Sequence, residues 1–314
     1  MSIHLAVARS VAGREPVHPL EFDAGPLGLE RIVVATALGA VVVHRSRIRT
    51  SAEATVLLHG AAGSWTTWTP LLRTAGRDRM TDVVVPDLPG WGGSAGPAAG
   101  VDGIDVASLA GAVADVTRAC GYKRWHVVGH SLGGFVALEL AAQRPEATTE
   151  VLLVSATTLG ARGDRLGAAR GWIAYPALFA LLLGMRLLAV LGQAGTALVR
   201  LLNRVGLLRL LASPLFAPGC RMHPSVVDAL AVEIRPAAFV RALHCARGYD
   251  AVARWGRILC PVVAVHGDRD VFIGRDDDAR LRSVIPRYTA VTLAATGHFG
   301  HIERPGLVLS ELGL

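Results

Sequence analysis

The sequence contains almost no lysine and few aromatic residues. Lys123 is the only lysine among 32 basic residues, and the arginines that make up the rest are scattered singly along the chain. Aromatic side chains form 5% of the composition, so few rings are available to stack on nucleic-acid bases. The net charge of +7 therefore does not predict a nucleic-acid-binding protein. A weak attraction to anionic membrane surfaces stays open, because positive charge is drawn to them.

Cysteine is also scarce, and its spacing excludes the usual cysteine-based sites. The four cysteines show no C-x-x-C pattern and no evident pairing; they are Cys120, Cys220, Cys245 and Cys260. Reduced thiols of this kind are typical of a reducing compartment, so we expect a cytoplasmic protein. We expect no metal, since no group of His, Cys and Asp residues has the spacing of metal ligands. The N-terminal segment "MSIHLAVARSVAGREP" lacks the basic region and apolar run of a secretory signal.

Long hydrophobic runs are absent too. A strongly apolar uncharged stretch extends from Gly171 to Met185 and is interrupted by Pro176. A transmembrane helix needs about 20 apolar residues, so we expect no membrane span. The composition, 52% hydrophobic and 18% charged, instead predicts a chain ordered around a large core. An irregular arm is expected only at residues 1–30, where glycine and proline are frequent.

Short apolar runs that predict buried strands recur along the chain. They are Ile32–Val34, Ala40–Val43, Thr55–Leu58, Val83–Val85, Trp125–Val128, Val151–Val154, Pro261–Val265 and Thr289–Leu293. Helical patterns at 108–120 and 132–143 separate some of these runs. Strands that alternate with helices are typical of an α/β fold with a mostly parallel, doubly wound sheet. The first two runs lie close together and predict an antiparallel hairpin at the edge of that sheet.

The alternation stops after the strand at 151–154 and resumes near residue 261. The segment between them is leucine-rich and helical in pattern, and Arg200 and Arg204 share one helix face at i, i+4 spacing. We therefore expect a core formed by residues 31–156 and 244–314, with a helical cap inserted at 157–243. Apolar helices must bury their surplus surface on something, either the sheet edge or an apolar ligand.

The stretch "VVGHSLGGF", residues 127–135, joins a predicted strand to a predicted helix. Gly129, Ser131 and Gly133 form the pattern G-x-S-x-G. A serine in so sharp a strand-to-helix turn has an exposed hydroxyl on a strained backbone, and the small neighbours relieve crowding. The alternative interpretation is an ordinary glycine-rich turn with an incidental serine.

Five stretches occur in an order that favours the first interpretation. They are "LLHGAAGSWTTW" (57–68), "VVPDLPGWGGS" (84–94), "VVGHSLGG" (127–134), "VVAVHGDRDVF" (262–272) and "TGHFGHIERP" (296–305). Together they resemble the α/β-hydrolase fold superfamily, of the lidded esterase, lipase and C–C hydrolase type. The resemblance covers residues 31–155 and 245–314, while the helical insert and the N-terminal arm match no motif.

The resemblance implies a catalytic triad in the chain order Ser, Asp, His: nucleophile Ser131, acid Asp270 and base His298. The chemistry agrees, since a serine hydroxyl needs an imidazole to accept its proton and the imidazole needs a carboxylate to orient it. Asp268 is the competitor for the acid, but the family spacing Gly-x-x-Asp selects Asp270. His301 competes for the base, but the first histidine of Gly-His-x-x-x-x-Glu-x-Pro is the catalytic one in the family.

An oxyanion hole is implied at two backbone N–H groups, those of Ala61 and Leu132. The motif "HGAAG" could be mistaken for a phosphate-binding loop, but it lacks the Gly-Lys-Ser/Thr ending. No G-x-G-x-x-G follows the first strand, so no nucleotide cofactor is expected. His59, His130 and His266 lie in turns and are expected to be structural or to line the pocket.

The function expected from these residues is a serine hydrolase for a small ester or thioester with an apolar part. Dehalogenases and epoxide hydrolases of this fold use an aspartate nucleophile, which Ser131 argues against. C–C bond hydrolases often carry tryptophan after the catalytic histidine, where this chain has Phe299. The alternatives left open are acyl transfer, C–C bond hydrolysis, cofactor-free perhydrolysis and ligand binding without catalysis. The oligomeric state is not predicted.

Overall fold

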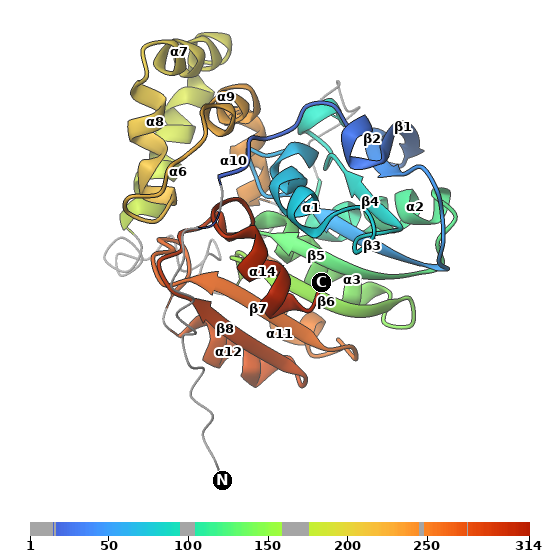
Figure 1. Ribbon diagram of the computed structural model, residues 1–314. Coiled ribbons are helices and arrows are strands. Elements are labelled where there is room, and N and C mark those ends of the chain that lie inside the picture. The colour runs from blue at the N-terminus through green and yellow to red at the C-terminus, as the bar shows by residue number, and fades with distance from the viewer. Residues whose placement is uncertain (1–14, 16, 95–103, 159–175, 245–247, 275) are drawn as a thin grey trace.

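The computed structural model describes residues 15, 17–94, 104–158, 176–244, 248–274 and 276–314 and is built around an eight-stranded sheet (Figure 1). The strands are β1 (Leu29–Thr36), β2 (Gly39–Ser46), β3 (Glu53–Leu58), β4 (Val83–Pro86), β5 (Arg124–His130), β6 (Thr148–Val154), β7 (Val262–Gly267) and β8 (Tyr288–Leu293). All eight predicted runs are strands, in the spatial order β1-β2-β4-β3-β5-β6-β7-β8.

Strand directions confirm the predicted α/β fold with a mostly parallel sheet. β1 and β2 form the expected antiparallel edge hairpin, with Ile32 opposite Val43, and β2 is also antiparallel to β4. From β4 to β8 all neighbouring strands are parallel. The carboxyl ends of these strands therefore meet at one edge of the sheet, where ligand sites form in open α/β folds.

The sheet is buried on both faces, as its continuous apolar strands require. In β3, Val56 and Leu58 belong to the core beneath α2 (Val106–Ala119) and α3 (Leu132–Gln143), whereas Leu57 belongs to the core beneath α1 (Thr69–Ala75) and α14 (Pro305–Leu312). α3 has the predicted bounds. α2 begins two residues earlier than predicted, because the Asp105 carboxylate accepts the Ser108 N–H (2.7 Å) and caps the helix there.

The described elements of the predicted insert, between β6 and β7, are helical. They are α6 (Pro176–Val190), α7 (Gln193–Arg204), α8 (Leu207–Ala212), η5 (Ser213–Leu215), α9 (Pro224–Glu233) and α10 (Pro236–His244). We call these elements the cap; they gather to one side of the sheet, at the upper left of Figure 1. Pro176, which interrupts the uncharged stretch 171–185, is the first described residue of α6, and a proline at the start of a helix loses no hydrogen bond. Residues 159–175 of the predicted insert lie outside the described part.

The remaining short elements complete the core. They are η1 (Gly25–Leu27), η2 (Trp65–Trp68), η3 (Gly92–Ser94), α11 (Ala251–Trp255), α12 (Asp277–Val284) and α13 (Gly300–Glu303). The described part of the expected arm is ordered by contacts, since Leu20 is buried against the cap and its N–H donates to Ser225 Oγ (2.9 Å). The start of the arm, residues 1–14 and 16, lies outside the described residues.

Two composition-based expectations can be compared with the described residues. None of the helices described there has both the length and the apolar character needed to cross a bilayer. Cys120 and Cys260 are buried and Cys220 is half-buried, and all three are free thiols. Cys245 lies outside the described residues.

Candidate active site

Ser131 occupies a strained turn between β5 and α3. Its backbone angles are φ 51° and ψ −117°, in a region that residues other than glycine seldom adopt. The turn is possible because its neighbours are glycines: a Cβ on Gly133 would lie 2.2 Å from the Leu58 carbonyl oxygen, and one on Gly129 would lie 2.5 Å from the Gly133 oxygen. The sequence thus places the Ser131 hydroxyl at the carboxyl edge of the sheet on a backbone that only this glycine pattern allows.

Asp270 and His298 form a hydrogen-bonded pair at the same edge, beyond β7 and β8. The His298 Nδ1 lies 3.0 and 3.1 Å from the two Asp270 carboxylate oxygens, and the two side chains are 0% exposed for Asp270 and 4% exposed for His298. A carboxylate can only accept, so Nδ1 carries the proton and Nε2 is left with a free lone pair. This is the tautomer that a general base requires.

The Asp270 carboxylate is held in its ionised form. Burial by itself would raise the pKa of Asp270, but the charge of His298 and the hydrogen bonds from the His298 ring and the Phe272 N–H together bring it below its ordinary value. The Phe272 N–H donates to Asp270 Oδ1 at 2.9 Å. Asp268, the competing acid, is exposed and accepts the Thr296 N–H at 3.3 Å, as a turn-capping residue does.

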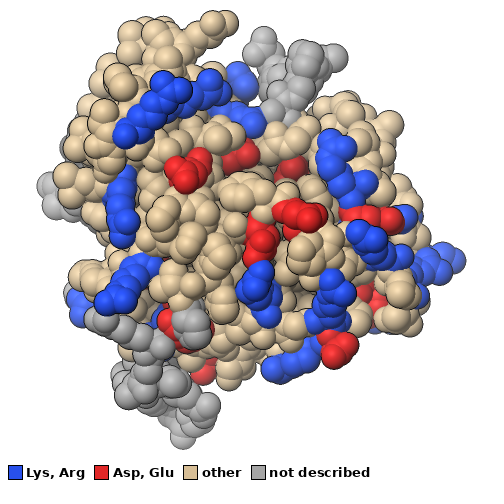
Figure 2. All heavy atoms as spheres, turned by 45° about the horizontal axis from the view of Figure 1, so that its top comes forward, with Lys and Arg blue, Asp and Glu red and all other residues tan. Residues whose placement is uncertain are grey.

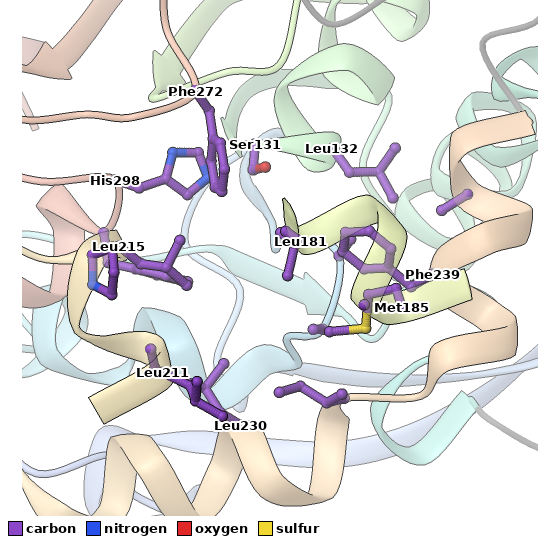
Figure 3. Close-up of a pocket in the computed structure, with 18 of the residues that line it drawn as sticks. Ser131, Leu132, Leu181, Met185, Leu211, Leu215, Leu230, Phe239, Phe272 and His298 are labelled. Atoms are coloured by element: carbon purple, nitrogen blue, oxygen red, sulfur yellow. The ribbon is translucent and has the colours of Figure 1, made fainter. Parts of the chain in front are cut away.

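Ser131 lines the same cavity as His298, but the two are not hydrogen-bonded. Within the described residues the Ser131 hydroxyl pairs with Thr157 Oγ1 at 3.0 Å, just beyond the end of β6. Figure 3 shows Ser131 and His298 at one end of the cavity. The structure therefore joins two of the three predicted triad residues directly and places the third beside them, with Thr157 as a partner that no motif predicted.

The two predicted oxyanion donors also lie at this cavity. Ala61 follows β3 and Leu132 follows Ser131, and both line the cavity wall. Among the described residues, neither backbone N–H donates to another group, so both remain free for a ligand oxygen. His59 supports this turn by donating from Nδ1 to the Gly60 carbonyl (2.8 Å) and accepting the Leu88 N–H at Nε2 (2.9 Å).

Two further histidines pack behind His298 and are unsuited to be the base. His130 Nε2 donates to the His298 carbonyl at 3.0 Å, which fixes the loop that carries His298. His301 is fully buried, with its ring centroid 4.4 Å from that of His130 and 4.5 Å from that of Trp68. Burial, followed by the charge of His298, lowers the pKa of His301 to about 3. An imidazole with so low a pKa is too weak a base to accept a proton from serine near neutral pH.

The loop of His298 is fastened to the cap, which the sequence did not reveal. The His298 N–H donates to the Leu215 carbonyl at 2.8 Å. Glu303 bridges the two parts, since its carboxylate accepts the N–H groups of Gly297 (3.1 Å) and of Ala217 in the cap (2.9 Å). Glu303 belongs to the histidine motif of the sequence, but its hydrogen bond to Ala217 of the cap joins distant segments and could be seen only in the structure.

The cavity beneath the cap has a volume of about 470 Å³ and an apolar lining. Its core side carries Ser131, Thr157 and His298, and cap residues such as Leu211 and Leu230 form the opposite end (Figure 3). None of the described lining residues is Asp, Glu, Lys or Arg. Within the described residues, no cluster of three or more His, Cys, Asp or Glu side chains could hold a metal ion.

Acidification is expected to destabilise the fold through buried histidines. Burial lowers the pKa of His59 to about 4 and that of His301 to about 3. Below the unfolded value of about 6.5, the unfolded chain binds protons that the folded chain excludes, so stability is complete above that pH and is lost as the pH falls toward the folded values. For each of these histidines, the free energy of unfolding falls by at most about 1.4 kcal/mol for each unit by which the pH is lowered. Urea unfolding at pH 7, 6 and 5 measures this slope.

The variant His301→Leu isolates one of these histidines. Burial raises the pKa of Asp87 and Glu303, which acts in the opposite direction but is common to both proteins. The free energy of unfolding of the variant should therefore depend less steeply on pH than that of wild type, and the difference in slope is the contribution of His301. Equal pH slopes for the two proteins would show that His301 is not held neutral.

Comparison with known proteins gives consistent results. The family described as "Alpha/beta hydrolase family" matches residues 55–311. RutD of Pseudomonas savastanoi pv. phaseolicola, whose name suggests carbamate hydrolysis, is 26% identical over 84% of this chain and 93% of its own length. An uncharacterized protein of Mycobacterium tuberculosis is 38% identical, but the match spans only 35% of this chain and 31% of that relative's length. The structure of carboxylesterase CesB of Bacillus subtilis shares the fold, with a TM-score of 0.68 at 17% identity over 91% of this chain and 92% of that one.

Proposed function

The chain belongs to the α/β-hydrolase family and is a hydrolase, and from that premise we propose that it cleaves a carboxylic ester or thioester with an apolar acyl or alcohol part. The observation that carries the proposal is the apolar cavity with Ser131 and the Asp270–His298 pair at one end. Such a cavity would bind an apolar group and hold its carbonyl beside a nucleophile.

In the proposed mechanism, Ser131 attacks the substrate carbonyl while His298 Nε2 accepts the hydroxyl proton. The negative charge that develops on the carbonyl oxygen is met by the N–H groups of Ala61 and Leu132. His298 then returns the proton to the leaving alcohol or thiol, and an acyl-enzyme on Ser131 remains. Water, deprotonated by His298, attacks this ester; the acyl–oxygen bond to Ser131 breaks, His298 returns the proton to Ser131 Oγ and the acid is released. Asp270 stabilises the imidazolium in both halves.

The Ser131 hydroxyl must exchange partners for this sequence to begin. In the structure it pairs with Thr157 Oγ1. Rotation about the Cα–Cβ bond of Ser131 is a small movement between staggered rotamers. Catalytic hydrogen bonds are often absent before substrate binds and form only in the complex. We therefore propose that the Ser131 hydroxyl is hydrogen-bonded to Thr157 in the free protein and to His298 Nε2 when substrate is bound.

The lining of the cavity supports an apolar, uncharged substrate. A charged group entering it would lose hydration without meeting an opposite charge from the described lining residues, which is costly. A volume of about 470 Å³ is ample for a medium-sized organic molecule. The similarity to RutD adds carbamates as a related substrate class, since a carbamate carbonyl would be attacked by the same hydroxyl.

Turnover is expected to rise with acyl chain length. Each methylene buried in the cavity contributes about 0.8 kcal/mol, which corresponds to roughly a fourfold gain in kcat/KM per carbon until the cavity is filled. A series of p-nitrophenyl esters from acetate to decanoate measures this gain. A flat series, or a preference for a carboxylated acyl group such as a succinate monoester, would contradict the apolar assignment.

Acyl transfer to an alcohol is the second candidate function. It uses the same acyl-enzyme and differs only in which nucleophile reaches it, and an apolar lining disfavours water there. Product analysis with an added alcohol separates the two activities: free acid indicates hydrolysis, and a new ester indicates transfer.

A further inference from the structure

The outer surface of the cap is rich in exposed hydrophobic side chains. More than half of the large hydrophobic residues that are exposed in the described part of the chain lie between Leu183 and Leu211. Soluble monomers rarely concentrate apolar surface in this way without a partner. This exposed apolar surface is largely separate from the cavity, because Leu211 is the only one of these residues that also lines it.

Helix α6 shows the arrangement most clearly. Leu183, Leu187 and Val190 follow one another at i, i+4 and i+7 and share one face, on which Leu187 is 60% and Val190 is 88% exposed. Leu181 and Met185, on another side of the same helix, line the cavity. α6 therefore has one apolar face for the cavity and a second that meets solvent.

The neighbouring helices repeat this pattern. In α7 and the residue that follows it, Leu198, Leu201 and Val205 are exposed at i, i+3 and i+7. In α8, Leu210 is 66% exposed. α7 packs against both α6 and α8, so the apolar faces lie on adjoining helices.

Positive charge accompanies this apolar surface, and α6, α7 and α8 carry no acidic side chain. The exposed Asp228 of α9 lies at its border, where it accepts the Asn203 amide of α7 (2.8 Å). Four exposed arginines belong to these helices: Arg186, Arg200, Arg204 and Arg209. The sequence contains no Asp or Glu from residue 176 to residue 227. In Figure 2 a row of basic side chains crosses the upper-left part of the molecule, where the cap of Figure 1 comes forward.

We propose that the outer face of α6, α7 and α8 docks on the surface of an anionic lipid bilayer. Leucines would enter the boundary between headgroups and acyl chains, and arginines would contact the lipid phosphates. A second copy of the chain fits less well, because a symmetric contact through this face would set arginines against arginines with no acidic side chain in residues 176–227 to pair with them.

The docking face also meets the candidate active site. Leu211 lines the cavity and yet is 59% exposed, so it lies where the cavity opens toward the outer surface of the cap. An apolar substrate could pass from the bilayer into the cavity past this residue. This last step rests on the proposed ester hydrolysis, whereas docking itself does not.

Flotation with lipid vesicles tests the docking. Wild-type protein is expected to float with vesicles of phosphatidylcholine containing about 30% phosphatidylglycerol, and to bind pure phosphatidylcholine much less, with the difference reduced by salt. Arg200→Glu/Arg204→Glu and Leu187→Glu/Val190→Glu should each lower the partition coefficient at least about tenfold. Ser131→Ala should bind like wild type, which separates a failure of docking from a failure of the proposed catalysis.

A matched control places the same change on other faces. Ile48→Glu/Leu259→Glu replaces two side chains that are 74% and 67% exposed outside the cap, and it should bind as wild type does. All variants should keep their circular dichroism spectra, and the arginine, leucine/valine and control variants, which retain Ser131, should also keep the wild-type turnover of p-nitrophenyl acetate. Absence of wild-type binding to anionic vesicles, equal loss in the control, or a wild-type dimer in size-exclusion chromatography that Leu187→Glu/Val190→Glu dissolves would overturn the proposal.

Discussion

Ser131→Ala is expected to lower kcat for ester hydrolysis by at least about 10⁴-fold and to leave the fold intact. The change removes the only atom that the proposed mechanism makes covalent with substrate. Alanine adds no bulk to the turn, and the φ of 51° is already imposed on a residue with a Cβ. The N–H groups of Ala61 and Leu132 and the apolar cavity stay in place, so a small residual rate should remain.

The control for this variant is Ser283→Ala. Ser283 lies in α12, and its hydroxyl donates to the Arg280 carbonyl on the exposed surface. Its kcat should equal that of wild type. If Ser131→Ala retained wild-type turnover of p-nitrophenyl butyrate, the hydrolysis would have to arise elsewhere in the molecule.

Asp270→Asn is expected to lower kcat by about 10⁴-fold while the variant still binds substrate. The asparagine amide can donate to Nδ1 of His298, which favours the tautomer whose proton is on Nε2. An Nε2 that carries a proton cannot accept one from Ser131. The loss should therefore appear in kcat rather than in KM, because nothing in the cavity lining has changed.

Asp268→Asn provides a control of the same chemistry two residues away. The Asp268 carboxylate is exposed, accepts the Thr296 N–H and lies 3.6 Å from the Arg269 Nε, so its interactions are at the surface and away from His298. A loss of less than about threefold is expected, since surface changes of this kind have small effects. Equal losses in the two variants would show that the loop, not the Asp270–His298 pair, controls the rate.

The strands and the nucleophile turn could be predicted because their signals are local. Runs such as Val151–Val154 are continuous apolar segments that contain β-branched valines and are bounded by polar or turn residues. The G-x-S-x-G pattern around Ser131 reflects a steric requirement within a few residues, because a Cβ on Gly129 would lie 2.5 Å from the Gly133 carbonyl oxygen. In each of these cases the physical cause lies within or beside the motif itself.

Contacts between distant segments could not be predicted. In the sheet, β4 lies between β2 and β3, so the spatial order differs from the chain order. No residue pattern within these strands indicates this order. The hydrogen bond from the His298 N–H to Leu215 joins segments with no shared pattern.

The measurement that tests the central claim most directly is covalent labelling with a fluorophosphonate, followed by mass spectrometry of the digested protein. The account predicts one stoichiometric adduct on the peptide containing Ser131, abolished in Ser131→Ala and greatly slowed in His298→Ala, where no base activates the hydroxyl. An adduct on a different residue, or labelling of Ser131 at an unchanged rate without His298, would contradict it.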